Sequence, residues 1–489
     1  MRAARRRTCL SLKLWRAVAV LGAAALTGCA VGPNYQRPEV TTIPPAYAGA
    51  TDEWKVATPQ AHLAKRNWWK VFGDEELNRL IADAVFSNFQ LQATAARFEQ
   101  ARAAAGVAGS GLYPHVGGSA SAMEQRDSEN RPVGGKAGET YSNFVVPFDL
   151  GYVFDLWGRA RRRVEAAKAQ EEAAAADVEA VKLTVQAEVA ADYFTIRMLD
   201  SEKVLLTTSV EAYRKALELT RNRRAAGIVS DLDVAQAETV LRTAEAQVTG
   251  TVLQRARFED ALAVLTGNNA SLFSVEERPL TVEPPVIPPG VPSELLERRP
   301  DVAAAERRMA GANANIGVAK AAFFPSIQLV GVAGFQSGDL GTLFDWPSRL
   351  WAVGPSLNIP LFDGGKLRSD LRGAQAGYLE TVARYRQTVL VAFAEVESNL
   401  AAQRLLALED EQAAAAAQAA RWQLEVAENR YRVGMTTYLA VAIAQVAALE
   451  RERSALRLRS ERLVATVALV KSLGGGWEGL GEIRKDVQP

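Results

Sequence analysis

The chain has 489 residues, with 57 Lys and Arg against 56 Asp and Glu, so its formal net charge is +1. By length alone it would hold about three ordinary domains of about 150 residues each. Six basic residues precede position 29: Arg2, Arg5, Arg6, Arg7, Lys13 and Arg16. The rest of the chain carries 51 basic and 56 acidic residues, a net charge of −5. A mildly acidic chain without a basic run interleaved with aromatics has no general attraction to nucleic acid, so nucleic-acid binding is disfavoured.

The N-terminus has the pattern of a secretory signal peptide over 1–28. A basic stretch at 1–16 precedes an apolar run at 17–26, and a run of about ten residues is too short to span a bilayer as a helix. The segment therefore targets the chain and does not anchor it. The pair Arg6-Arg7 leaves a twin-arginine signal open as an alternative.

A cysteine follows the apolar run directly. The sequence Leu-Thr-Gly-Cys at 26–29 resembles the lipobox of bacterial lipoproteins, in which the cysteine is diacylated and becomes the first mature residue. The other cysteine, Cys9, would be removed with the signal peptide, so Cys29 has no disulfide partner. Cys29 is therefore the predicted lipidation site, carrying a covalent N-terminal lipid. In such lipoproteins, Ala30 in place of Asp implies sorting to the outer membrane.

The chain contains two copies of one unit. A constant offset of 207 residues relates Gly158 to Gly365, 187–189 to 394–396, Arg223 to Arg430, Gly227 to Gly434 and Gly267 to Gly474. Before Gly158 the offset is 211, since Tyr113-Pro114 matches Phe324-Pro325, so the second copy has four extra residues in its strand region. Each copy should contain a helix, two strands, a very long helix, a tight turn and another long helix.

Long helices are expected over 159–226 and 366–433. The first range has neither Pro nor Gly and would make about 100 Å of helix at about 1.5 Å per residue. Helices of this length pack side by side as coiled coils. Seven-residue repeats support this: Val234, Leu241, Val248 and Leu262, interrupted by Arg255, and Ala442, Leu449, Leu456, Leu463 and Val470.

Four strands are expected at about 113–125, 141–155, 325–337 and 350–362. Every even residue from Phe144 to Phe154 is large and apolar, while Asn143, Asp149 and Gly151 occupy the other face. Ranges 327–335 and 351–361 alternate in the same way, whereas the first strand is too rich in Gly and Ser to show a preference. Pro147, Pro355 and Pro360 count mildly against central strand positions, because proline cannot donate to the ladder.

Periodicity alone does not tell lipid from a protein core on the apolar face. However, the chain is secreted and lipidated, and only helices or closed barrels satisfy every backbone group in lipid. Four strands are too few for a barrel, since about eight is the practical minimum. Several chains must therefore share one membrane barrel.

Four segments carry a resemblance to a known family: Cys-Ala-Val-Gly-Pro-Asn-Tyr at 29–35, Trp-Trp at 68–69 with Phe-Gly-Asp at 72–74, Leu-Glu-Arg-Arg-Pro-Asp-Val at 296–302, and Leu-Gly-Gly-Gly-Trp at 473–477. They are similar to the TolC-family outer-membrane efflux lipoproteins of RND-type tripartite pumps, the NodT-like outer-membrane factors. The resemblance implies a mostly α fold with a small membrane β-barrel. It implies a homotrimer, in which four strands from each protomer complete a 12-stranded barrel in outer-membrane lipid and the helices continue as a periplasmic tunnel. The implied partners are a periplasmic adaptor (membrane fusion) protein and an inner-membrane RND pump.

The expected boundaries follow from the repeat and the resemblance together. They are a signal peptide at 1–28, an extended segment at 29–75, a first repeat at 76–278, a Pro-rich connector at 279–293, a second repeat at 294–474 and a tail at 475–489.

The resemblance also assigns the two helix-to-helix turns to the periplasmic tip, where the adaptor docks and the channel closes. The tip residues are Arg223, Gly227, Ile228, Arg430, Gly434 and Met435. Glycine suits a chain reversal after a helix, and Ser230 and Thr437 are placed to cap the next helix. Family members often carry an Asp one turn beyond the tip, but this position holds Ile443. Together with Leu439, four residues earlier, it predicts an apolar gate.

No catalytic constellation is present. The two histidines, His62 and His115, lie far apart, and no metal-ligand cluster, nucleophile elbow or phosphate loop is found. We therefore expect no enzyme activity, no metal and no cofactor beyond the covalent lipid. The function expected is a passive conduit for export of drugs or other small molecules. Two alternatives remain: a duct for type I protein secretion, and a non-conducting lipid-anchored coiled-coil scaffold in the periplasm.

Overall fold

The computed structural model describes residues 30–38, 67–130, 138–285 and 299–475. The signal peptide, Cys29, His62, most of the extended segment, the end of the connector and nearly all of the tail lie outside the described residues. The elements in chain order are η2 (Trp68–Phe72), α2 (Glu75–Ser87), α3 (Phe89–Ser110), β1 (His115–Gly118), β2 (Ser121–Arg126), β3 (Thr140–Phe154), α4 (Arg159–Ala225), α5 (Asp231–Leu265), η3 (Ala270–Leu272), α7 (Pro300–Ala321), β4 (Ser326–Ser337), η4 (Leu340–Thr342), η5 (Trp346–Ser348), β5 (Arg349–Asn358), α8 (Lys366–Arg432) and α9 (Tyr438–Ser472).

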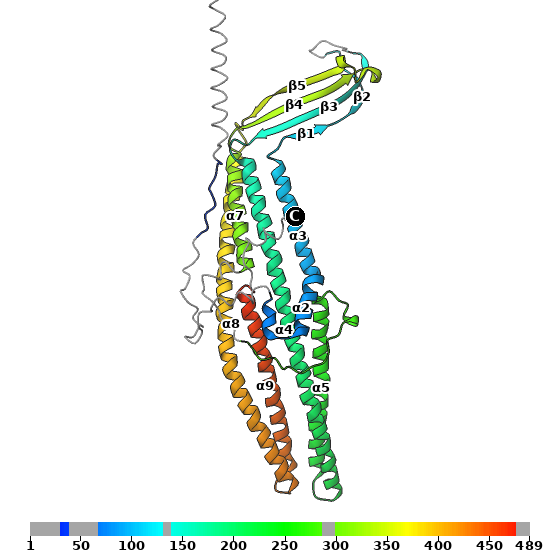
Figure 1. The fold of residues 1–489 in the computed structure, drawn as a ribbon, viewed down its shortest axis with the longest axis vertical. Coiled ribbons are helices and arrows are strands. Elements are labelled where there is room, and N and C mark those ends of the chain that lie inside the picture. The colour runs from blue at the N-terminus through cyan, green and yellow to red at the C-terminus, as the bar shows by residue number, and fades with distance from the viewer. Residues whose placement is uncertain (1–29, 39–66, 131–137, 286–298, 476–489) are drawn as a thin grey trace, which may run out of the picture. The chain divides into compact units, whose positions relative to one another are not determined.

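The described chain divides into two compact units. Glu99–Ala173 and Ala305–Arg384 form the first together with the N-terminal segment that ends at Pro38. Ala174–Ala304 and the chain from Tyr385 form the second, together with residues 67–98. The first unit holds the strands and the second holds the two helix turns (Figure 1). Helices α4 and α8 each contribute residues to both units.

All strands form one antiparallel sheet in the order β1-β3-β4-β5, with β2 also paired to β3. The expected first strand is divided into β1 and β2, although both pair with β3 in one continuous register, from His115 opposite Gly151 to Arg126 opposite Thr140. The division falls opposite Pro147. The Ser119 amide donates to the Pro147 carbonyl at 3.1 Å, but proline has no amide hydrogen to return the bond.

The expectation that Pro147 disfavours a central strand was wrong, because β3 pairs on both sides. Its neighbour in β4 is Gly334, and a Cβ built on that glycine would lie 2.7 Å from the Pro147 Cα and 2.2 Å from the Val146 carbonyl oxygen. Glycine thus provides the close backbone approach that accommodates the proline. Pro355 lies in β5, at an edge of the sheet.

The register gathers the large apolar side chains on one face of the sheet. Residues directly opposite one another share a face, and the pairs on this face include Phe148 with Ala333, Leu150 with Gly331, Phe154 with Ile327, Ala333 with Trp351 and Ile327 with Leu357. We call this the apolar face. The other face carries Gln125, Asn143, Asp149, Gln328, Gln336 and Asn358.

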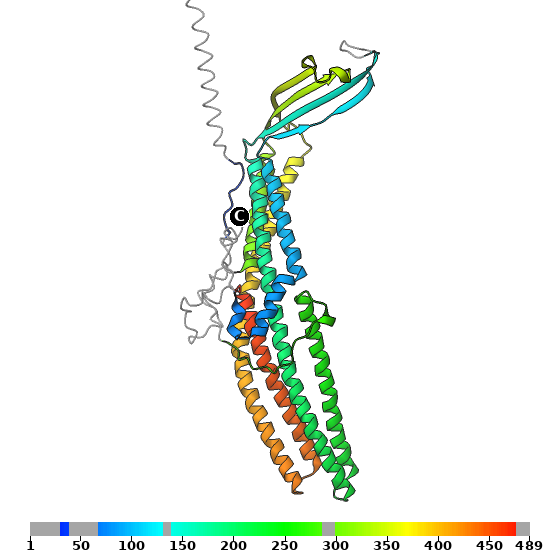
Figure 2. The ribbon, with the colours of Figure 1, turned by 45° about the vertical axis from the view of Figure 1, so that its right-hand side comes forward.

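The apolar face is open to solvent in the single chain. Trp351 is 73% exposed, Leu357 59% and Phe148 57%. In Figures 1 and 2 the strands lie beyond the helix ends of the first unit, and no described helix of that unit covers the sheet. Three-residue turns η4 and η5 connect β4 to β5.

The second unit is a set of packed helices with two apolar clusters. The first cluster joins Trp68, Trp69 and Phe72 to buried residues of α4 such as Phe194. The second joins α4, α5, α8 and α9 near the turns. Of the five heptad residues expected on α9, four are buried: Ala442, Leu449, Leu463 and Val470. No helix among the described residues has both the length and the apolar character needed to cross a membrane.

Candidate functional site

The two helix turns have the same backbone structure. Gly227 and Gly434 adopt φ of 74° and 79°, the left-handed region that favours glycine. The amide after each glycine donates to a carbonyl five residues earlier, from Ile228 to Arg223 at 2.9 Å and from Met435 to Arg430 at 2.8 Å. This arrangement ends α4 and α8 by satisfying one of their last free carbonyl groups.

Arg223 ties the first turn to the second. Its Nη1 donates to the carbonyl of Tyr431 and its Nη2 to the carbonyl of Arg432, both at 2.9 Å. Its guanidinium carbon also lies 4.5 Å from the centroid of the Tyr431 ring. A side chain of α4 therefore caps the C-terminus of α8, where the helix dipole favours a cation.

A group of buried tyrosines lies beneath the turns. The rings of Tyr431 and Tyr438 pack edge to face, with their centroids 5.5 Å apart. The Tyr438 hydroxyl donates to Gln445 Oε1 at 3.3 Å. The Tyr213 hydroxyl donates to the Gln445 carbonyl at 3.1 Å. Burial raises the pKa of Tyr213 and of Tyr438 to about 12, so both hydroxyls stay neutral donors at physiological pH. The sequence analysis did not identify this group, because Tyr213, Tyr431 and Tyr438 lie on three different helices.

The remaining predicted tip residues are on the surface. Ile228 is 69% and Met435 67% exposed. Arg430 is exposed, and its side chain makes no hydrogen bond or ion pair with the described residues. Ser230 and Asp233 form a capping box on α5. Thr437 occupies the N-cap position of α9 as predicted, but its side chain makes no capping hydrogen bond.

Both predicted gate residues lie on the open side of α9. Leu439 is 49% exposed and Ile443 58%, whereas their neighbours Tyr438 and Ala442 are buried in the cluster near the turns. Val446, three residues further, is 50% exposed. These three residues form an apolar stripe, spaced as one face of a helix, that is about half exposed in the single chain.

The segment after the predicted lipidation site is bound along the first unit. We call residues 30–38 the strap. The Val31 amide donates to the Trp157 carbonyl at 3.0 Å, and Arg162 Nη2 donates to Asn34 Oδ1 at 2.7 Å. Asn313 Nδ2 donates to the Pro33 carbonyl at 3.0 Å.

The strap therefore contacts both repeats. Arg162 belongs to α4 and Asn313 to α7, and both are buried. Close approach is required at two glycines, because a Cβ on Gly32 would lie 2.6 Å from the Gly317 Cα and a Cβ on Gly158 would lie 2.8 Å from the Ala30 Cα. The strap thus begins at Gly158, where β3 ends and α4 begins.

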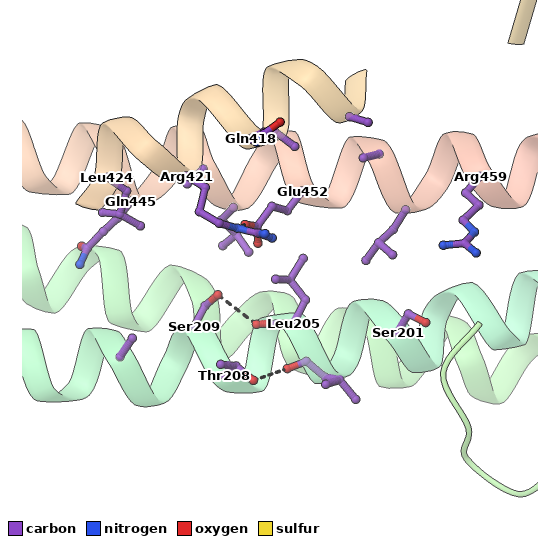
Figure 3. A pocket seen from close by; sticks show the side chains of 18 of the residues that line it. Ser201, Leu205, Thr208, Ser209, Gln418, Arg421, Leu424, Gln445, Glu452 and Arg459 are labelled. Atoms are coloured by element: carbon purple, nitrogen blue, oxygen red, sulfur yellow. Dashed lines mark hydrogen bonds and ion pairs between the residues drawn. The ribbon is translucent and has the colours of Figure 1, made fainter. Parts of the chain in front are cut away.

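The second unit has an open groove between α4, α8 and α9, with a volume of about 1060 Å³ (Figure 3). Apolar side chains such as Leu205 and Leu424 line it, and Arg421 of α8 pairs with Glu452 of α9 across it at 2.6 Å. Ser209 and Thr208 point into it, but each hydroxyl donates to a carbonyl of its own helix. The described residues contain no group of His, Cys, Asp and Glu arranged to hold a metal ion.

Comparison with known proteins identifies the family. The family model described as outer membrane efflux protein matches residues 80–268 and 291–475. The chain is 34% identical over 469 residues to the probable efflux pump outer membrane protein SepC of Pseudomonas putida, covering 93% of this chain and 96% of that protein. It is 32% identical over 468 residues to outer membrane protein OprJ of Pseudomonas aeruginosa, covering 94% and 95%.

A solved structure agrees with these matches. The CmeC outer membrane channel of Campylobacter jejuni superposes with a TM-score of 0.87 at 27% identity, covering 94% of this chain and 98% of that chain. These relatives are outer-membrane channels and efflux components rather than enzymes. The chain belongs to the outer membrane efflux protein family and is a protein of the outer membrane.

Proposed function

We propose that three copies of this chain close their sheets into one 12-stranded barrel and form a passive conduit across the outer membrane. Drugs or other small molecules pass through it, driven by an inner-membrane RND pump that connects through a periplasmic adaptor. The observation that carries this proposal is an exposed apolar sheet face bounded by two unpaired edges.

Both edges of the sheet need partners. The sheet ends at β1 and β2 on one side and at β5 on the other, which leaves one row of backbone donors and acceptors unpaired at each edge. An open edge is not tolerated in hydrocarbon, so the edges must pair. Pairing β5 of one copy with β1 and β2 of the next closes the sheet, and the two matches to the family model support a repeated architecture within each copy.

The length of the apolar face fits a membrane. The ten steps from Phe144 to Phe154 in β3 span about 33 Å at about 3.3 Å per residue, and a tilt of about 45° reduces this to about 23 Å. The apolar band of an outer-membrane barrel is about 25 Å tall.

Aromatic residues lie at both ends of this band. Tyr152 and Phe154 pack together at the end near the helices, and Trp346, in the connection between β4 and β5 at the other end, is 72% exposed. Tryptophan and tyrosine are enriched where a membrane meets water.

The strap supports lipidation at Cys29 as a membrane anchor. It begins beside Gly158, at the junction of strand and helix, which in the proposed barrel lies at the periplasmic surface of the membrane. An acyl chain attached to Cys29 would therefore extend from the protein at the height of the lipid.

The two turns form the proposed adaptor site, with Arg223, Gly227, Ile228, Arg430, Gly434 and Met435 around it. Ile228 and Met435 present exposed apolar side chains at the ends of the turns. Leu439 and Ile443 form the proposed apolar gate where three copies approach one another. Replacing Ile443 with Ala should raise single-channel conductance of the purified trimer. An unchanged conductance would show that Ile443 does not restrict the path.

The proposal is tested on the full-length, detergent-purified protein. We expect a trimer by native mass spectrometry, a heat-resistant trimer band on denaturing gels, and stepwise conductance in planar lipid bilayers. A water-soluble monomer without pore activity after removal of the lipid would contradict the conduit and favour a scaffold. Deleting the gene for the chain should sensitise cells to small toxic compounds, and a loss of protein export alone would instead indicate a secretion duct.

A further inference from the structure

The two turns share a sequence motif as well as a backbone structure. Asn222 and Arg223 precede Gly227, and Asn429 and Arg430 precede Gly434, with the same spacing in both repeats. The backbone hydrogen bonds also correspond one to one. In the first turn the amides of 226, 227 and 228 donate to the carbonyls of 222, 224 and 223, respectively. In the second turn the amides of 433, 434 and 435 donate to the carbonyls of 429, 431 and 430, respectively. The ends of α4 and α8 are therefore equivalent surfaces.

The two equivalent arginines nevertheless differ in their partners. Arg223 donates to the carbonyls of Tyr431 and Arg432, at the end of the other repeat's helix. Arg430 is exposed and has no such partner among the described residues. The offset of 207 residues relates positions 431 and 432 to Arg224 and Ala225 at the end of α4. The carbonyls of Arg224 and Ala225 are therefore the equivalent acceptors in the first repeat. Within one chain these two carbonyls accept no side-chain hydrogen bond from the described residues.

We propose that Arg430 donates to the carbonyls of Arg224 and Ala225 in the next copy of this chain. In a closed ring of three copies, the turns of the first and second repeats alternate. Within each chain, Arg223 then links the first-repeat turn to the second-repeat turn. Between chains, Arg430 links the second-repeat turn to the first-repeat turn of the next copy. The inference rests on the proposed trimer and assigns Arg430 to a subunit contact.

The receiving surface suits a guanidinium group. The last carbonyls of a helix lack intrahelical partners and carry the negative end of the helix dipole. Arg224 would bring a like charge to this surface, but its Nε already donates to Asp231 at 2.7 Å. The carboxylate offsets that charge.

The link between chains should be weaker than the link within the chain. Arg223 gains a contact with the aromatic ring of Tyr431, whereas the position equivalent to Tyr431 in the first repeat holds Arg224. Arg430 would therefore make the hydrogen bonds without the cation–π contact.

Cross-linking of the full-length trimer tests the proposal. Arg430→Cys is combined with Ala225→Cys and treated with a short bis-methanethiosulfonate reagent, because an arginine side chain separates positions too widely for a direct disulfide. We expect covalent dimers and trimers on denaturing gels. The matched control combines Arg223→Cys with Arg432→Cys, which should cross-link within the monomer, as detected by peptide mass spectrometry.

Failure to form covalent dimers in a preparation that is trimeric and cross-links at the control pair would overturn the inference and leave the proposed function intact. A preparation that is not trimeric would instead contradict the proposed function. As a second readout, Arg430→Gln should lower the temperature at which the trimer band dissociates, with partial recovery in Arg430→Lys. If Arg430 serves only a different protein partner, trimer dissociation will be unchanged, which also overturns the inference.

Discussion

A single charged side chain holds two helices and the chain after α5 together in the second unit. Arg255 occupies the position that interrupts the heptads of α5, and it is buried. Its Nε donates to Asp200 at 2.6 Å, its Nη1 to Glu259 at 2.8 Å and its Nη2 to the Val275 carbonyl at 2.6 Å. A buried guanidinium requires this number of partners. An arginine at a core position was thus the sequence signal for a clamp that holds the chain after α5.

Asp192 provides a test at the residue scale. Burial, and then the nearby Glu188, raise the pKa of its carboxyl to about 6. Between about pH 4 and 6 the carboxyl is therefore protonated in the native state but ionised in the unfolded chain. The contribution of Asp192 to stability falls as the pH rises through that window. We expect Asp192→Asn to stabilise the protein at pH 7.5 by the order of 1–2 kcal/mol, allowing for the solvent that still reaches the side chain.

Thermal unfolding of the detergent-solubilised protein measures this effect. The increase in Tm of Asp192→Asn over the parent should be present at pH 7.5 and shrink towards pH 4.5. Glu218→Gln, an exposed position on the same helix, should show no such pH-dependent difference. An equal Tm for Asp192→Asn and the parent at pH 7.5 would show that the buried charge carries no cost.

At the scale of elements, the strap acts as a structural part of the first unit. It is held by side chains of α4 and α7, so we expect its docking to be independent of an acyl chain on Cys29. Gly32→Ala places a Cβ 2.6 Å from the Gly317 backbone at a φ of 114°, so we expect the strap to detach and stability to fall by about 1–3 kcal/mol. Hydrogen exchange of the peptide 30–38 should accelerate.

Two controls separate strap docking from other effects. Gly250→Ala, in α5 with open space around its Cβ, should be neutral or slightly stabilising, because alanine is the better helix former. Cys29→Ser removes the lipidation site but should leave exchange of the strap slow. If that variant exchanges as fast as Gly32→Ala, the acyl chain rather than the side chains holds the strap.

Local patterns predicted most of the elements, and contacts between distant segments escaped prediction. The long helices end at Ala225 and Arg432, each one residue before the predicted end, because the absence of helix breakers and a following glycine are both local signals. The bonds from Arg223 to Tyr431 and from Arg162 to Asn34 join residues more than a hundred positions apart. No periodicity in a single sequence encodes such a pair. Pro147 was misjudged for the same reason, since its compensating partner, Gly334, lies on another strand.

At the scale of the whole molecule, the proposed conduit depends on which solvent meets each face of the sheet. Adjacent residues of a strand point to opposite faces, so Phe148 and Asp149 in the middle of β3 should face lipid and the water-filled lumen respectively. The same new residue at these two positions therefore provides a matched test. Arginine near the middle of a bilayer costs about 2–4 kcal/mol on a lipid-facing strand, and the cost is incurred three times in a trimer.

We expect Phe148→Arg to abolish or strongly reduce trimers in outer-membrane fractions. Asp149→Arg should insert normally and shift the ion selectivity of the open channel towards anions, because it replaces a ring of three carboxylates with a ring of three guanidinium groups. Membrane fractionation and reversal potentials in a salt gradient measure the two outcomes. Equal insertion of both variants would mean that the apolar face does not contact lipid. Failure of Asp149→Arg alone would mean that the two faces are assigned the wrong way round.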